Sequence, residues 1–360
     1  MSWQSLGIQH KQVAEKLAAT MRIALAGRED LPGVLAALAE RIPSGSIAGP
    51  PFSIIRFVTS VTDGVDAEIG FPVTRTFETD MLQTRTFPPL NVLSLVHTGP
   101  LEGLGATYST LFGSTADQGL ISDEFVREVY PDWELADWSR VEVQFVLHDW
   151  DALFAGNLDR VLGGEARRRV MQGVDEPGTG STLDERFRWA KEMVERLDRS
   201  AGEGQVYDVL SSCAHIFPLE QIDKLRAVYV DTLSETSDPL QAVDAVIAFM
   251  DRDPGWGEAP LREGRVILGT KAPRDAEAYE TADSAAEKRR AYCFCPIVRN
   301  RLERDMPAAF CYCGAGWYRQ QWEGAMGRAV RIDILKSILR GDSECQFAIR
   351  LPDDLWHDTR

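Results

Sequence analysis

Two short cysteine pairs are the most unusual chemical feature of the sequence. Cys293 and Cys295 form one Cys-x-Cys pair, and Cys311 and Cys313 form the other. Zinc prefers four thiolate or imidazole ligands in a tetrahedron, although its usual short spacing is Cys-x2–4-Cys. In extended backbone both thiols of a pair lie on one side and can chelate, whereas on a helix they diverge by ~200°. We therefore predict that these four cysteines hold zinc, with a short helix over 296–310 returning the second pair to the first.

The same cysteines have a second interpretation. Free cysteine is among the most buried residue types and packs as a small apolar side chain. Aromatic residues flank both pairs, at Tyr292, Phe294, Phe310 and Tyr312. The alternative to a metal site is therefore aromatic–sulfur packing. Cys213 and Cys345 complete the set of six, and we expect reduced thiols rather than disulfides because the first twenty residues lack the apolar segment of a secretory signal.

A carboxylate on an amphipathic segment is the second candidate for chemistry. Between 140 and 148, Val141, Val143 and Phe145 alternate with Glu142 and Gln144, which predicts a half-buried strand. In a cleft, the Glu142 carboxylate would either pair with a planar cationic ligand or, with a raised pKa, act as a general base or acid. Taken alone, such a residue is more commonly a solvated surface group.

Aromatic residues near this strand would form the walls of such a cleft, although core packing explains each of them equally well. These ligand-binding candidates are Phe57, Tyr108, Trp133, Trp138 and Trp150. His148 lies six residues from Glu142 on the same strand face, ~20 Å along the strand, so the two cannot share a proton. We expect His148 to be a surface residue at the strand end, and His97 has no assigned role. Nucleophile-elbow, Walker, Rossmann and zinc-protease motifs are absent from the sequence.

The elements that would position these residues divide the chain into four parts. Residues 1–50 have apolar residues at helical spacing and are predicted to be a helical N-terminal extension. Residues 51–150 alternate strands (53–59, 65–73, 91–97, 140–148) with helices (104–112, 123–130) and form the ligand-binding domain. Residues 151–204 are a helical connector whose main helix starts with a capping box at Thr182 and Glu185. Residues 205–360 are a cysteine-containing α+β domain that ends in a hairpin, 330–338 and 345–351.

Composition excludes several classes of partner. The chain has 360 residues with 39 Lys+Arg against 55 Asp+Glu, a net charge of −16, and no basic patch, so nucleic acid is not expected as a direct partner. No apolar run approaches the ~18 residues of a membrane helix, so we expect no membrane partner and a cytoplasmic location. The two predicted N-terminal helices cannot bury their apolar stripes alone, which favours a homodimer.

Residues 52–150 resemble a known family. The segments Phe71-Pro72-Val73, Val96 to Glu102 and Val141-Glu142-Val143 occur in the order found in the GyrI-like small-molecule-binding domain, the effector-binding module of AraC-type and MerR-type regulators. The resemblance implies an α+β fold: a duplicated two-layer unit with a ligand cleft between its halves, here followed by a helix-rich α+β domain. It also implies that Glu142, as the acidic residue of the last strand, points into the cleft. Leu101 replaces the tyrosine that usually follows Gly-Pro in this family.

The resemblance implies two functions. One is binding of a cationic or planar xenobiotic by a protein that lacks its own DNA-binding domain, since the first fifty residues are too few and too weakly basic to supply one. The alternative is a hydrolase of strained, cyclopropane-type electrophiles that uses Glu142 as its catalytic residue. A metal- or redox-responsive scaffold is a third hypothesis, based on the cysteines alone. The final segment, Gly341-Asp342 to Phe347, resembles the end of four-vinyl-reductase-type sensor domains.

Overall fold

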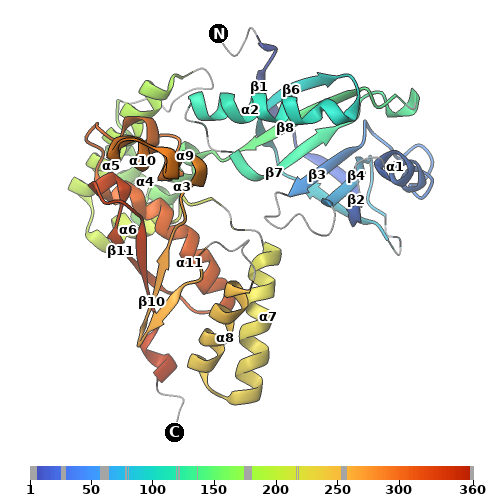
Figure 1. Ribbon diagram of the computed structural model, residues 1–360. Coiled ribbons are helices and arrows are strands. Elements are labelled where there is room, and N and C mark those ends of the chain that lie inside the picture. Colours follow the sequence, from blue (N-terminus) through green and yellow to red (C-terminus); the bar gives the residue numbers. More distant parts are fainter. Residues whose placement is uncertain are drawn as a thin grey trace. The chain divides into compact units, whose positions relative to one another are not determined.

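The computed structural model contains two compact units, residues Met1–His148 and Asp149–Arg360 (Figure 1). It describes residues 6–25, 30–56, 65–77, 79, 81–118, 120, 122–135, 137–173, 181–215, 217, 219–252 and 258–356. Both units combine helices with antiparallel sheet, so the predicted α+β class is confirmed. Within these ranges, none of the helices has the length and apolar character that crossing a membrane requires.

The first unit is built on an eight-stranded antiparallel sheet with the order β1-β6-β8-β7-β3-β4-β2-β5. Its strands are β1 (Gln9–Val13), β2 (Lys16–Leu25), β3 (Phe52–Arg56), β4 (Val65–Pro72), β5 (Gln83–Phe87), β6 (Leu90–Thr98), β7 (Ser122–Val129) and β8 (Arg140–Leu147). Its helices are α1 (Leu31–Ala39) and α2 (Leu104–Gln118).

This sheet is a duplication. The segments β2-α1-β3-β4 and β6-α2-β7-β8 each run strand–helix–strand–strand, and in each the last strand lies between the other two, as β2-β4-β3 and β6-β8-β7. The two repeats join where β3 pairs with β7, and β5 and β1 each add an outer strand. The predicted duplicated α+β unit is therefore present.

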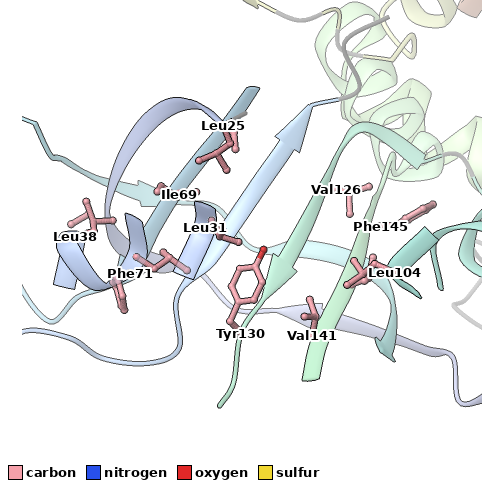
Figure 2. Packing of buried hydrophobic residues seen from close by; sticks show 14 of the residues in the cluster. Leu25, Leu31, Leu38, Ile69, Phe71, Leu104, Val126, Tyr130, Val141 and Phe145 are labelled. Atoms are coloured by element: carbon pink, nitrogen blue, oxygen red, sulfur yellow. The ribbon is translucent and has the colours of Figure 1, made fainter. Parts of the chain in front are cut away.

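One apolar core lies between the sheet and both helices. Helix α1 buries Leu31, Leu35 and Leu38, and α2 buries Leu104 and Leu111 in the same cluster (Figure 2). Because α1 contacts β4 while α2 contacts β6 and β8, each helix covers its own repeat on a shared face of the sheet. The opposite face carries neither helix, and we call it the open face.

The N-terminal residues differ from the prediction. The segment expected to be a helix, with Leu17 and Met21, is strand β2, paired with β4 on one side and β5 on the other. A four-residue spacing also fits a two-residue period, and Leu17, Ala19, Met21 and Ile23 all pack into the core as a strand requires. Of the two helices predicted for the N-terminal residues, only the second is present, as α1, and its leucines are buried within the unit. The reason given for a homodimer, two helices with exposed apolar stripes, therefore does not hold.

A second predicted helix, over 123–130, is strand β7. Its backbone pairs with β3 and with β8, and these cross-strand hydrogen bonds override the local pattern. The predicted strands over 53–59, 65–73, 91–97 and 140–148 match β3, β4, β6 and β8 over the residues that are described, and the helix over 104–112 matches the first part of α2.

The second unit contains both the predicted connector and the predicted C-terminal domain. Its helices are α3 (Trp150–Leu162), α4 (Gly164–Met171), α5 (Leu183–Ser200), α6 (Glu203–Ser211), α7 (Leu219–Thr236), α8 (Pro239–Asp251), α9 (Ala276–Thr281), α10 (Ala285–Tyr292) and α11 (Tyr312–Met326). Its sheet has the order β11-β12-β10-β9, formed by β9 (Leu261–Glu263), β10 (Val266–Thr270), β11 (Arg331–Lys336) and β12 (Gln346–Arg350).

Two local predictions for this unit are confirmed. The Thr182 side chain accepts a hydrogen bond from the backbone N–H of Glu185, and the Glu185 carboxylate accepts one from the backbone N–H of Thr182 at 2.7 Å, so the capping box is complete. The predicted C-terminal hairpin is the antiparallel pair β11 and β12. In place of the short helix expected over 296–310 there are two 3-10 turns, at Arg299–Arg301 and at Ala308–Cys311.

Two glycines of α11 provide a test of the packing in this unit. A Cβ at Gly316 would lie 1.9 Å from the Ser211 carbonyl oxygen, whereas at Gly314 its nearest neighbour would be Phe347 Cζ at 3.4 Å. We predict that Gly316→Ala lowers the free energy of unfolding by ~1–3 kcal/mol, because the helix end that carries Ser211 must move away. Gly314→Ala, the matched control, should be neutral or stabilising by up to ~1 kcal/mol. Urea unfolding of both variants checks this, and equal losses would contradict the close helix contact.

Candidate functional site

A buried carboxylate lies at the centre of the first unit's sheet. Glu128 of β7 pairs across the sheet with Ser53 of β3 on one side and with Val143 of β8 on the other. Only 1% of its surface is exposed. Because side chains alternate along a strand, Val126, Glu128 and Tyr130 all face the helices. Glu128 therefore lies where the two repeats meet.

Two tyrosines hold this carboxylate. Tyr108 of α2 donates its hydroxyl proton to Oε1 of Glu128 at 2.5 Å, and Tyr130 donates to Oε2 at 2.6 Å. The Tyr130 hydroxyl also lies 2.9 Å from Oγ of Ser53. Burial, together with the charge of Glu128, raises the pKa of Tyr130 well above its ordinary value. Tyr130 therefore stays a hydrogen-bond donor throughout the neutral pH range.

Two tryptophans belong to the same core as this hydrogen-bonded group. The Trp133 ring packs edge-on against Phe71 at 4.8 Å, and Trp138 lies 5.7 Å from Tyr130. Figure 2 shows Tyr130 between side chains that belong to the α1 repeat and side chains that belong to the α2 repeat. Tyr108, Trp133 and Trp138, all expected to line a ligand site, are half-buried against this core. Of the three, Tyr108 contacts Glu128 directly and Trp138 contacts Tyr130, while Trp133 packs on Phe71 in the same core.

Glu142 lies on the open face instead. Its neighbours Val141 and Val143 are fully buried under the helices, so alternation directs Glu142 away from Tyr108. Its carboxylate forms an ion pair with Lys11. Partial burial would by itself raise the pKa of Glu142, but the hydrogen bond and charge of Lys11, together with hydrogen bonds from Gln144 and Ser94, hold that pKa below its ordinary value. The predicted grouping of Glu142 with Tyr108, Trp133 and Trp138 is therefore not formed.

The sequence did carry a signal for Glu128. Read as a strand, residues 126 to 130 place one carboxylate between two core-facing side chains, Val126 and Tyr130. An acidic residue at the centre of an apolar strand face is uncommon unless it is paired, and it marks a candidate site. The residue was missed because the segment was predicted to be helical, which hides this alternation.

The remaining candidates lie elsewhere. Trp150 belongs to the core of the second unit, where its ring lies 5.2 Å from Phe154, and it is not part of the arrangement around Glu128. Phe57 lies outside the described residues. His97 is a buried structural residue that contacts the Thr107 hydroxyl and the Pro100 carbonyl oxygen, each at 3.0 Å. His148 is 8% exposed, so the prediction of a surface residue was wrong.

The cysteines do not assemble as the predicted zinc ligands. Among the described residues, which include all six cysteines, no three Cys, His, Asp or Glu side chains are placed to hold a metal ion. Cys311 caps α11 and Cys313 lies in its first turn, where helical geometry separates their side chains. Cys311 Sγ lies 3.2 Å from the Ser337 hydroxyl, while Cys313 donates to the Cys213 carbonyl oxygen at 3.3 Å. This arrangement favours the packing interpretation.

Comparisons with known proteins give family information for one segment. Residues 272–356 match the model of a family of unknown function, DUF6144. No curated protein matches the chain.

Several solved structures share low similarity with the chain. The EcmrR C-terminal domain is 17% identical with a TM-score of 0.35, over 39% of this chain and 96% of that one. SAV2435 bound to tetraphenylphosphonium is 12% identical with a TM-score of 0.30, over 40% and 96%. A hydrolase encoded by lin2189 from Listeria innocua is 12% identical with a TM-score of 0.30, over 39% and 91%. The chain spans 56% of EcmrR in its DNA complex, at 17% identity and a TM-score of 0.34.

The raised pKa of a buried thiol predicts that the stability of the protein depends on pH. Burial raises the pKa of Cys213 from 9.0 to about 12. Because the thiol has a higher pKa in the folded protein than in the unfolded chain, its protonated form stabilises the fold. This contribution is complete at a pH below the pKa of the unfolded chain, and it is lost as the pH rises toward the pKa of the folded protein. We expect the stability difference between the native protein and Cys213→Ala to narrow above pH 9. Urea unfolding at pH 8, 9.5 and 10.5 measures it, and a difference that stays constant would contradict the assignment.

Proposed function

We propose that the first unit binds a planar organic cation at Glu128. The observation that carries this proposal is a carboxylate with 1% exposure, held by two tyrosine hydroxyls at the junction of two repeats. A ligand admitted beside this group would contact side chains from both halves of the sheet. The GyrI-like resemblance, which implies a ligand site between the halves, supports the same location.

The physical reason is the cost of a buried charge. A carboxylate that has left water loses several kcal/mol of solvation, and hydrogen bonds from Tyr108 and Tyr130 offset part of it. A cation placed nearby adds Coulomb attraction, which is stronger where water is excluded. Aromatic faces such as those of Trp133 and Trp138 add cation–π attraction and stacking area. A planar cation gains from both terms, whereas a neutral ring gains from the second alone.

Hydrolysis with Glu142 as the base has weaker support. A general base works best with a pKa near the operating pH. The pKa of Glu142 is lowered by Lys11, and the aromatic candidates around Glu128 lie on the other face of the sheet. Binding is therefore the function that the arrangement of these residues favours.

We predict that Glu128→Gln weakens binding of the planar cation 10-methylacridinium ~10–100-fold, because the charge is lost while the shape is kept. Glu142→Gln is the matched control, the same change on the opposite face, and should alter affinity less than about twofold. The neutral and equally flat 10-methylacridone should bind both variants and the native protein alike. Isothermal titration calorimetry on the full chain measures the affinity of each of the three proteins for both compounds.

Thermal unfolding of both variants shows whether the fold is retained. Equal affinity of the native protein and the Glu128→Gln variant for the cation would refute a role of Glu128 as its charged partner. If only Glu142→Gln weakened binding of the cation, the cation site would lie on the open face.

A further inference from the structure

The open face of the first unit carries a pocket of about 230 Å³. Its lining residues Phe52, Ile54 and Arg127 alternate along β3 and β7 with residues that face the helices, so this pocket is separated by the sheet from Glu128. Both repeats contribute to it. The lining consists of Val13, Ala14, Lys16, Phe52, Ile54, Arg85, Thr86, Phe87, Pro88, Leu90, Phe125 and Arg127.

The walls of this open-face pocket are aromatic and apolar. Phe52 and Phe87 meet edge to face at 5.6 Å. Phe125 packs against two small apolar clusters, one containing Phe52 and the other containing Val13. These side chains provide surfaces on which a flat hydrocarbon ring can be buried.

All three charged residues that line the pocket are cations, in a chain whose net charge is −16. Arg85 is already neutralised, because its Nη2 lies 2.6 Å from the Glu68 carboxylate. Lys16 and Arg127 are the other two cations of the lining. A pocket with this lining repels organic cations and attracts anions.

Arg127 has an uncompensated donor. Its side chain is 5% exposed, its guanidinium lies 4.3 Å from the centre of the Phe52 ring, and its Nε has no hydrogen-bond partner in the described part of the chain. Buried donors without a partner are rare, because each loses its solvation without gaining a hydrogen bond in return. A ligand with acceptor oxygens would supply that partner.

The charges around Arg127 also favour an anionic ligand. Burial lowers the pKa of Arg127 to about 10, so it stays protonated at neutral pH. Burial and the charge of Arg127 also lower the pKa of Lys16. The carboxylate of Glu142, whose charge acts on both residues, is paired with Lys11. Two like charges therefore share the pocket, and an anion between them would relieve their repulsion.

We infer that the open-face pocket binds a small aromatic carboxylate. The carboxylate would accept hydrogen bonds from Arg127, whose planar guanidinium matches it, and would be attracted by Lys16. The ring would lie among Phe52, Phe87 and Phe125. This site differs from the one at Glu128 in its face of the sheet and in the charge of its ligand, so either can fail without the other.

The test compares 2-naphthoate with its neutral isostere 2-naphthamide on the full chain by calorimetry. We expect naphthoate to bind at least ~10-fold more tightly than the amide, with an affinity that falls as salt rises. Arg127→Met should weaken naphthoate at least ~10-fold, because it removes the charge while keeping an apolar chain against Phe52. Arg140→Met, on the neighbouring strand and 52% exposed, is the matched control and should leave binding unchanged. Glu128→Gln should also leave it unchanged.

Lys16→Met provides a second route should Arg127→Met fail to fold, and it should weaken naphthoate without affecting the amide. Equal binding of acid and amide, or no binding of naphthoate at millimolar concentration, would overturn the proposal. Unchanged naphthoate affinity in a folded Arg127→Met or Lys16→Met variant would do so as well.

Discussion

The pairing of β3 with β7 is the constraint on which the first unit depends. It joins two strand–helix–strand–strand repeats into one sheet, and it sets Ser53 opposite Glu128. Because the register also fixes which side chains face the helices, it sends Glu128 to the helix-covered face and Arg127 to the open face. A shift of one residue would exchange the two charges and place both in the wrong surroundings.

Consecutive residues of one strand thus carry opposite charges to opposite faces, and each charge is compensated separately. Tyrosine hydroxyls hold the Glu128 carboxylate, and the Phe52 ring lies under the Arg127 guanidinium. Burying an ion costs several kcal/mol even when it is partly compensated, so a fold selected for stability alone gains little from either group. The ligands proposed for the two faces would pair with these charges, and the aromatic side chains on both faces offer surfaces to flat rings.

The second unit uses its unusual residues differently. Its cysteines are set among helix ends and aromatic rings, and burial keeps their thiols protonated, with the pKa of Cys311 raised to about 12. A thiol in that state is a small apolar group with a weak hydrogen bond, as the contact with Ser337 illustrates. Trp150, expected to line a ligand site in the first domain, is likewise part of this unit's core.

Local patterns in the sequence were enough to predict several secondary-structure elements of this protein. The alternation around Val141 and Val143, the capping box at Thr182 and the C-terminal hairpin were readable because each depends on residues a few positions apart. The duplicated unit followed from a resemblance carried by short segments in the right order. The strands β2 and β7 were not readable, since their four-residue apolar spacing fits a helix as well as a strand. Only pairing with β4 and β5, and with β3 and β8, decided between the two. The position of the buried carboxylate followed from that decision, because the face that a strand residue occupies is set by partners far away in the chain.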